Sequence, residues 1–262
     1  MLGFTMDKKR IKKVLMAFPG GKALIRSRAS ILAHRQLAQR YPQMDDAKEV
    51  FRHHYESNGW GNAESVSGPG STLQYTENIR KMLPRLAEEL GIQVILDAPC
   101  GDYNWFRMIE WNARITYIGG DIVQPLVEHN RALYGTDNTM FKRLDVVNDV
   151  LPRADLWLCR DCLFHLSERD IFLVFDNFLK SNIAYMLTST HPGCDLNTDI
   201  PTGWARPINL QLPPFSLGNP IRVIDDWIEG YPVRYLALWE RGAVKDALAS
   251  NKEFHRTIKC RR

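Results

Sequence analysis

The strongest constraint on the fold of this chain is a series of short apolar runs that begins near residue 94, with a helix-length segment between most of them. The runs are VILDA (94–98), ITYIGGD (115–121), TMFKRLD (139–145), DLWLCR (155–160), IAYMLTS (183–189) and, after a long gap, RYLALWE (234–240). Strands that are buried on both faces lack the alternation of apolar and polar residues seen in a half-exposed sheet. The runs therefore predict an α/β fold, a doubly wound and mostly parallel sheet with helices on both faces.

The remaining segments suggest a division of the 262 residues into four parts. We expect a basic N-terminal arm (1–45), a helical lead with a glycine-rich loop (46–92), the sheet-containing core (93–242) and a basic C-terminal tail (243–262). The lead contains helical patterns at 44–57 and 72–90 on either side of the loop GWGNAESVSGPGS. Residues 191–220 have little periodicity and many prolines and glycines, which predicts a long loop or lid inserted into the core.

Charge is unevenly distributed along the chain. Residues 1–40 hold ten lysines or arginines and one acid, whereas the rest holds 24 basic and 29 acidic residues. The arm is either a solvated extension or an attachment to an anionic membrane face or a phosphate-bearing substrate. The second interpretation is favoured by Ile11, Val14, Leu15 and Phe18, which fall at helical spacing beside the basic residues. No basic patch with interleaved aromatic residues occurs in the body, so nucleic acid is not an expected partner.

Composition suggests a cytoplasmic protein, with peripheral membrane contact through the arm as the alternative. No run of about 18 apolar residues occurs, and the N-terminus has no secretory signal pattern. Five scattered cysteines are typical of reduced thiols rather than of a disulfide framework. Oligomeric state is not predicted by these features.

Three of the apolar runs end in aspartate, namely Asp97, Asp121 and Asp145, at steps of 24 residues. One strand and one helix occupy about that length, so the three carboxylates are expected along one edge of the sheet. That edge, at the carboxyl ends of parallel strands, is where open α/β sheets bind ligands.

The turn after the first run suggests which ligand binds there. Gly101 permits a tight turn and close approach to the backbone, and Asp121 is placed to bind the two hydroxyls of a ribose. Asp97 and Asp102 flank this single glycine, and two carboxylates would repel a pyrophosphate but attract a sulfonium or an ammonium. The sequence therefore predicts a nucleoside that carries positive charge.

The series VILDAPCGD, YIGGDI, FKRLDV and DLWLCRDCLFHLS resembles the successive motifs of class I S-adenosylmethionine-dependent methyltransferases. The resemblance covers about residues 90–190. It matches a divergent DxxCG branch, because Ala98, Pro99 and Cys100 stand where glycine is common. It implies a Rossmann-like sheet with an antiparallel last strand, S-adenosylmethionine as cofactor and methyl transfer of class EC 2.1.1.

The resemblance also implies roles for individual residues. The turn from Asp97 to Asp102 would lie at the methionine moiety, Asp121 at the ribose and Asp145 with Val146 at the adenine edge. Arg160 is expected at the cofactor or, alternatively, as an anchor for an acidic substrate. The complete expected cofactor set is Asp97, Pro99, Cys100, Gly101, Asp102, Trp105, Asp121, Ile122, Asp145, Val146 and Arg160.

Candidate catalytic residues follow the fourth apolar run, beneath the expected methyl group. His165 is the first candidate for a general base because histidine titrates near neutral pH, and Asp161 is the second. His165 could instead orient a loop. The candidate acceptor-binding residues are Trp60, Ser67, Ser71, His191, Asp199, Trp204 and Arg206.

These residues predict a methyltransferase for a hydroxyl group of a small-molecule or carbohydrate acceptor. The polar and aromatic side chains of 191–220 favour a polyhydroxylated acceptor. Three alternatives remain open, namely an N-methyltransferase of a small amine, an NAD-type oxidoreductase and a methyltransferase-like adaptor that binds the nucleoside without transferring a group. A metal is not expected, because the spacing of Cys159, Cys162 and His165 does not match the common structural zinc sites.

Overall fold

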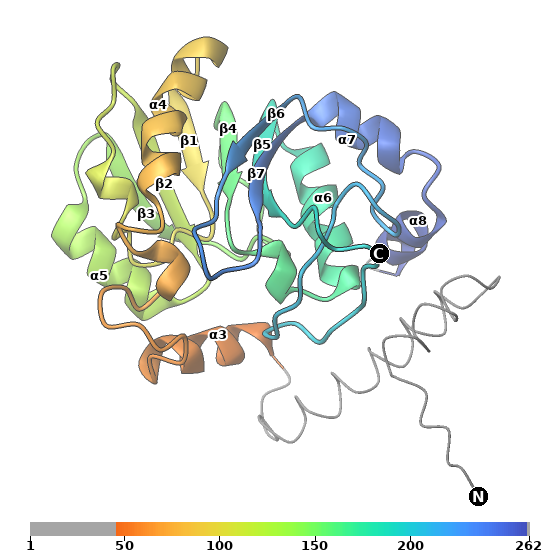
Figure 1. Ribbon diagram of the computed structural model, residues 1–262, viewed down its shortest axis with the longest axis horizontal. Coiled ribbons are helices and arrows are strands. Elements are labelled where there is room, and N and C mark those ends of the chain that lie inside the picture. The colour runs from red at the N-terminus through yellow and green to blue at the C-terminus, as the bar shows by residue number, and fades with distance from the viewer. Residues whose placement is uncertain (1–45, 261–262) are drawn as a thin grey trace, which may run out of the picture.

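A single sheet of seven strands runs through residues 46–260, which are the residues that the computed structural model describes (Figure 1). The strand order is β3-β2-β1-β4-β5-β7-β6. The strands are β1 (Val94–Asp97), β2 (Thr116–Asp121), β3 (Thr139–Arg143), β4 (Leu156–Cys159), β5 (Tyr185–Thr190), β6 (Arg222–Asp225) and β7 (Tyr235–Glu240). Strands β1 to β5 are parallel, and β7 is antiparallel to both β5 and β6. The expected fold class is confirmed, while the expected basic arm lies outside the described residues.

Helices cover both faces of the sheet (Figure 1). The α-helices of the described part are α3 (Ala47–Glu56), α4 (Glu77–Leu90), α5 (Gln124–Tyr134), α6 (Glu168–Lys180), α7 (Arg241–Leu248) and α8 (Lys252–Lys259). Three short 3₁₀ helices are η1 (Pro69–Ser71), η2 (Phe106–Met108) and η3 (Leu163–His165). None of the helices between residues 46 and 260 is long and apolar enough to cross a bilayer.

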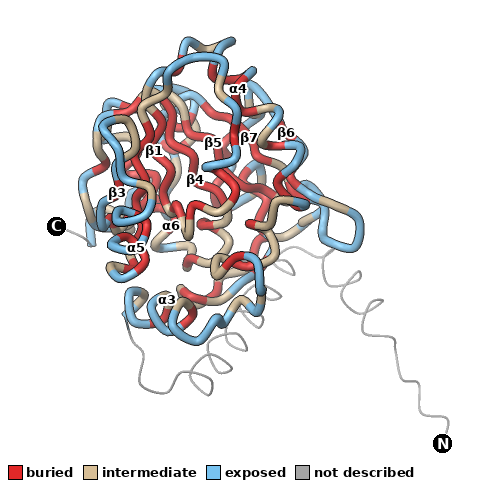
Figure 2. Tube along the Cα trace, turned by 90° about the vertical axis from the view of Figure 1, so that its left-hand side faces the viewer, coloured by how far each residue is buried: buried red, intermediate tan, exposed pale blue. Residues whose placement is uncertain are grey.

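Alternation along the strands divides the core into two apolar clusters. Leu96 and Ile118 point to the face covered by α6, α7 and α8, whereas Ile95 and Tyr117 point to the face covered by α4 and α5. Figure 2 shows the central strands buried along their length. Both faces are therefore removed from water, which explains why the strands read as continuous apolar runs.

The helix termini follow local sequence signals. Ser167 caps α6 by accepting a hydrogen bond from Asp170 N, and Asp46 caps α3 by accepting one from Lys48 N. Helix α4 ends at Gly91, whose φ of 65° is left-handed and therefore suits glycine. These ends fix where the chain enters and leaves the sheet.

Most element boundaries differ from the sequence-based expectation by one to three residues, and three differences are larger or bear on the site. Helix α4 begins at Glu77 rather than at residue 72, because Thr72 closes a separate turn in which its carbonyl accepts from Thr76 N and Oγ1. Strand β3 ends at Arg143 rather than at Asp145. Strand β6 was not predicted, since this four-residue edge strand is mostly exposed and only Ile224 is buried.

The segment 191–220 does not form a separate lid. Its buried residues Ile208, Leu210, Phe215 and Leu217 belong to the core cluster beneath α6. The expected C-terminal tail likewise contains α7 and α8, which pack on α6. Both segments bury apolar side chains and are part of the body.

We predict that Gly119→Ala in β2 destabilises the fold by about 1–3 kcal/mol. A Cβ atom at this position would lie 2.6 Å from the Phe141 ring, in the middle of the sheet. Gly193→Ala is the control, because nothing lies within 4 Å of a Cβ built there, and its effect should stay within about 0.5 kcal/mol. Urea unfolding of both variants measures the difference, and equal effects would contradict this view of the sheet.

Candidate active site

A cavity of about 500 Å³ lies at the carboxyl ends of β1, β2 and β4. Helix α3 and the glycine-rich loop also contribute to its lining, and in Figure 1 they lie beyond that edge of the sheet. Of the residues expected at the cofactor, all but Asp102 line this cavity. Asp97, Asp121 and Asp145, the three aspartates expected along one edge of the sheet, therefore line one cavity.

The turn after β1 is held against the glycine-rich loop. Gly101 has a φ of 56°, and a Cβ atom there would lie 2.3 Å from Ser67 Oγ. Asp102 N donates to Ser67 Oγ at 2.9 Å, and the Asp102 carboxylate accepts from Val66 N at 3.0 Å. Asp102 thus binds the glycine-rich loop and lies outside the cavity. The group that approaches Gly101 closely is the Ser67 side chain.

Asp97 lies at the end of β1 and is almost completely buried. Tyr117 on the neighbouring strand donates its hydroxyl proton to Asp97 Oδ2 at 2.8 Å. Burial raises the pKa of Asp97 to about 7, although the hydrogen bond from Tyr117 and the charge of Arg160 act in the opposite direction. A cation bound beside this carboxyl would stabilise its charged form.

Asp121 at the end of β2 is also buried and faces the same turn. Its Oδ2 accepts from Gly101 N at 3.1 Å, and its Oδ1 accepts from Val123 N at 3.0 Å. Burial raises its pKa, and these backbone N–H groups oppose the shift. The carboxylate therefore holds the turn and the start of α5 while it lines the cavity.

Asp145 lies two residues beyond β3. Its Oδ1 accepts from Val147 N at 2.9 Å, so the carboxylate closes a local turn. Asp145, Val146 and Val147 all line the cavity next to Ile122. This part of the wall combines apolar side chains with one carboxylate.

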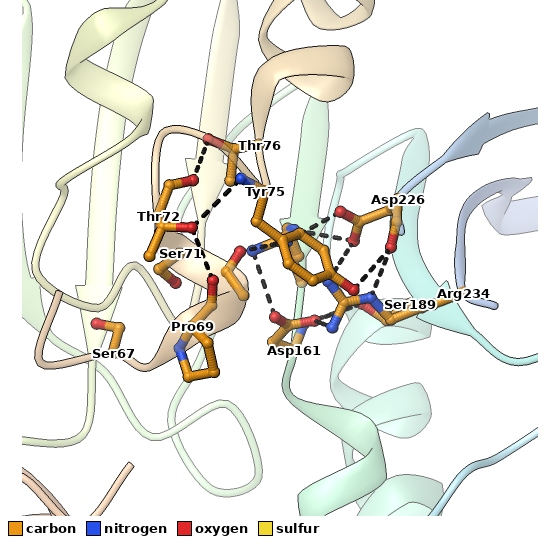
Figure 3. Close-up of polar contacts among 12 residues, drawn as sticks. Ser67, Pro69, Ser71, Thr72, Tyr75, Thr76, Asp161, Ser189, Asp226 and Arg234 are labelled. Atoms are coloured by element: carbon orange, nitrogen blue, oxygen red, sulfur yellow. Dashed lines mark hydrogen bonds and ion pairs between the residues drawn. The ribbon is translucent and has the colours of Figure 1, made fainter. Parts of the chain in front are cut away.

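Two arginines and two aspartates form a buried charge cluster at the other end of the cavity. Its members are Arg160, Asp161, Asp226 and Arg234, and Figure 3 shows the last three converging beside Tyr75. Asp226 accepts two hydrogen bonds from Arg160, at 2.9 and 3.0 Å. Asp161 lies 2.7 Å from Arg234 Nη1 and 3.3 Å from Arg160 Nη1. The formal charges of the cluster cancel.

The cluster is extended by backbone and aromatic contacts. Arg160 Nη2 donates to Gly70 O of the glycine-rich loop at 2.7 Å. The Arg160 guanidinium lies 5.4 Å from the Trp105 ring centroid, and that of Arg234 lies 4.9 Å from the Tyr75 ring centroid. Segments that are far apart in sequence therefore meet at this wall.

Both carboxylate oxygens of Asp161 are engaged in ion pairs, one with Arg234 and one with Arg160, which makes it a poor general base. Burial alone would raise the pKa of Asp161, but the charges of Arg160 and Arg234 outweigh it and lower the pKa. Ser189 Oγ also donates to Asp161 Oδ1 at 3.1 Å. The carboxylate is therefore held ionised by the charge cluster.

His165 lies in η3 and lines the cavity. Its Nδ1 lies 3.0 Å from Trp204 O, an acceptor, so the bond requires the proton on Nδ1 and leaves Nε2 with a free lone pair. Burial lowers the pKa of His165 to about 4. The ring is therefore neutral at physiological pH and has the tautomer that a proton acceptor needs.

The residues expected to bind the acceptor separate into two groups. Trp60, Ser67, Ser71 and His191 line the cavity. Asp199, Trp204 and Arg206 do not line it, because they make hydrogen bonds within the protein.

Specific contacts account for these three residues. The Asp199 carboxylate accepts from Glu168 N at 2.7 Å, and Arg206 Nη1 donates to Leu163 O at 3.1 Å. Burial lowers the pKa of Arg206 to about 10. Trp204 contributes its carbonyl to His165 and is therefore a positioning residue.

Several cavity residues were not predicted from the sequence. They are Phe51, Tyr55, Tyr75, Phe164, Tyr231 and Arg234. Tyr75 belongs to the helical lead, whereas Tyr231 and Arg234 belong to the connection between β6 and β7. The fold brings these two segments together, and the sequence does not indicate that contact. Phe51 and Tyr55 did carry a signal, since they lie four residues apart in the helical pattern at 44–57 and so share one face of the helix.

Among the described residues, no three histidine, cysteine or acidic side chains are grouped as a metal site would require. Cys159 and Cys162 are both buried, and contact with Cys159 together with burial raises the pKa of the Cys162 thiol. A thiol with a raised pKa is a poor thiolate ligand.

Comparison with known proteins identifies the fold. No protein-family model and no curated protein sequence matches the chain. Among solved structures, the chain resembles magnesium protoporphyrin IX methyltransferase (ChlM) from Synechocystis PCC 6803 with bound SAM, with a TM-score of 0.53 and 16% identity over 76% of this chain and 99% of that one. The same enzyme with bound SAH gives a TM-score of 0.53 and 15% identity, covering 75% and 100%. The chain thus has a methyltransferase fold.

We predict that Asp226→Asn lowers the free energy of unfolding by about 3–5 kcal/mol, because it leaves two buried arginines to share one carboxylate. The control is Glu89→Gln, which removes an ion pair with Arg222 whose side chains are 49% and 52% exposed. That change should cost no more than about 1 kcal/mol. Urea unfolding compares the two variants, and a loss below 1 kcal/mol for Asp226→Asn would contradict a stabilising cluster.

Proposed function

We propose that this protein is an S-adenosylmethionine-dependent methyltransferase that methylates a hydroxyl oxygen of a small-molecule or carbohydrate acceptor. The observation that carries the proposal is the pair of buried carboxylates, Asp97 and Asp121, on either side of the Gly101 turn at the carboxyl edge of a methyltransferase fold.

The chemistry of the cavity fits this cofactor. Asp97 offers negative charge for the sulfonium and ammonium groups, and Asp121 offers oxygens to ribose hydroxyls. Ile122, Leu126 and Val146 supply an apolar surface suited to adenine. The volume of about 500 Å³ lies within the usual range for ligand sites, and when bound the cofactor supplies an activated methyl group.

One of these carboxylates argues against a dinucleotide. A pyrophosphate would lie at the turn after β1, where Asp97 is buried and its charged form would repel it. An NAD-type oxidoreductase is therefore disfavoured by the charge of the wall.

In the reaction that we propose, His165 Nε2 takes up the proton of the hydroxyl group that is methylated. The Trp204 carbonyl keeps the imidazole in the required tautomer. Asp161 has a different role, since its pairing with Arg160 and Arg234 shapes the wall beside the reacting oxygen. Alignment of the acceptor with the methyl group would account for most of the rate enhancement.

Titration of the protein with S-adenosylhomocysteine and with NAD, followed by calorimetry, tests the cofactor. We expect binding of the first and none of the second. Asp121→Ala should weaken binding at least 100-fold, because it removes two hydrogen bonds to a charged group that are worth about 1.5 kcal/mol or more each. Asp137→Ala, at an exposed acid outside the cavity, should leave binding unchanged. Tight binding of NAD alone would refute the proposal.

His165→Asn tests the base, because the asparagine amide can still donate to Trp204 O while the ring nitrogen is lost. We expect kcat to fall by about 10²–10⁴ with affinity for S-adenosylhomocysteine within twofold. Since the lowered pKa of about 4 keeps His165 neutral, kcat of the wild type at saturating cofactor should be flat between pH 6 and 8. Unchanged turnover in the variant would remove His165 from this role.

A further inference from the structure

Aromatic side chains from several segments of the chain line the cavity. We call Phe51, Tyr55, Trp60, Phe164 and Tyr231 the aromatic wall. The first four are half-buried and Tyr231 is 44% exposed, so the rings retain surface that the core does not cover. Such surface at a cavity is typical of a binding site for a molecule with apolar faces.

The candidate base is set into this wall. The His165 ring centroid lies 4.8 Å from that of Trp60 and 4.3 Å from that of Phe164. Trp60 is in turn stacked on His54 at 4.2 Å with an interplanar angle of 16°. The imidazole ring of His165 therefore has an aromatic neighbour in both Trp60 and Phe164.

The acceptor half of the cavity presents no unbalanced charge. Asp161, Arg160 and Arg234 line it, but they are paired within the charge cluster. Burial lowers the pKa values of both His165 and His191, which keeps both rings neutral. An acceptor with its own charge would lose solvation without finding an unpaired counter-charge.

The polar side chains that favoured a polyhydroxylated acceptor are occupied elsewhere. Asn197 Nδ2 donates to Asn209 O at 2.8 Å, and Asn209 N donates to Asn197 Oδ1 at 2.8 Å. Asp199 and Arg206 likewise bond within the body and lie outside the cavity, and Arg206 Nη2 has no hydrogen-bond partner among the described residues. Each sugar hydroxyl left without a partner would cost about 1–3 kcal/mol.

Building on the proposed function, we propose that the acceptor is a neutral aromatic molecule with a hydroxyl group, a phenol, whose ring packs on the aromatic wall. Its O–H proton moves to His165 Nε2 while an oxygen electron pair forms the bond to the methyl carbon. The electrons of the breaking carbon–sulfur bond stay on sulfur, which becomes a neutral thioether. The products are an aryl methyl ether and an imidazolium, which then loses its proton to solvent.

Methyl transfer from S-adenosylmethionine by the full-length protein, compared across four probes, tests the acceptor class. The probes are 2-naphthol as a neutral phenol, 4-hydroxybenzoate as an anionic one, tyramine as a cationic one and methyl glucoside as a polyol. We expect kcat/KM for 2-naphthol to exceed that of each other probe at least tenfold. Preferred turnover of any other probe, or no binding of 2-naphthol to the S-adenosylhomocysteine complex in calorimetry, would overturn the proposal.

Variants of α3 test the location. Phe51→Ala should raise the Kd of 2-naphthol at least tenfold and leave the affinity for S-adenosylhomocysteine within twofold. Phe51→Leu, which preserves packing, should give an intermediate Kd. Arg52→Ala is the matched control on the same helix, because Arg52 is exposed and pairs only with Glu56 among the described residues, and it should change neither.

Failure of this inference is distinguishable from failure of the proposed function. Binding of S-adenosylhomocysteine without binding of 2-naphthol contradicts the acceptor class alone, whereas absence of S-adenosylhomocysteine binding contradicts the methyltransferase itself. Equal Kd values for 2-naphthol in the wild type and in folded Phe51→Ala would exclude the aromatic wall as its site. Melting temperatures show which variants are folded.

Discussion

The pairing of Arg160 and Arg234 with Asp161 and Asp226 is the interaction on which the site depends. It joins the end of β4, the β6–β7 connection and, through Gly70 O, the glycine-rich loop. Each arginine would be costly to bury without a carboxylate partner, so the loss of either aspartate would disfavour the approach of these segments. Each of the three segments contributes to the lining of the cavity, through Gly70, Asp161 and Arg234.

Electrostatics divides this cavity into two halves with different chemistry. On one side, Asp97 and Asp121 are buried and share no arginine of their own at ion-pair distance among the described residues, which suits a cationic nucleoside. On the other, the charges are cancelled and aromatic rings dominate. Under the proposed function, this division would place opposite demands on the two ligands, since the cofactor would be selected by its charge and the acceptor by its lack of charge.

The sheet could be predicted from the sequence because strands buried on both faces and separated by helix-length segments admit few alternatives. Asp97 and Asp121 were found for the same reason, since they end strands that must be neighbours. Asp226, Arg234 and Tyr75 could not be found, because each acquires its role from a partner far away in sequence. Asp199 and Arg206 misled the prediction, since polar residues in a proline-rich loop look alike whether they bind a ligand or the loop's own backbone.

The contact between Ser67 Oγ and Gly101 has an evolutionary consequence. A side chain at position 101 would displace the loop, and loss of the Ser67 hydroxyl would remove the acceptor for Asp102 N. A substitution at Ser67 or at Gly101 alone would therefore disturb the contact. Among homologues we expect Ser67, Gly101 and Asp102 to be retained or replaced together. The lead before the sheet and the turn after β1 are therefore expected to vary together.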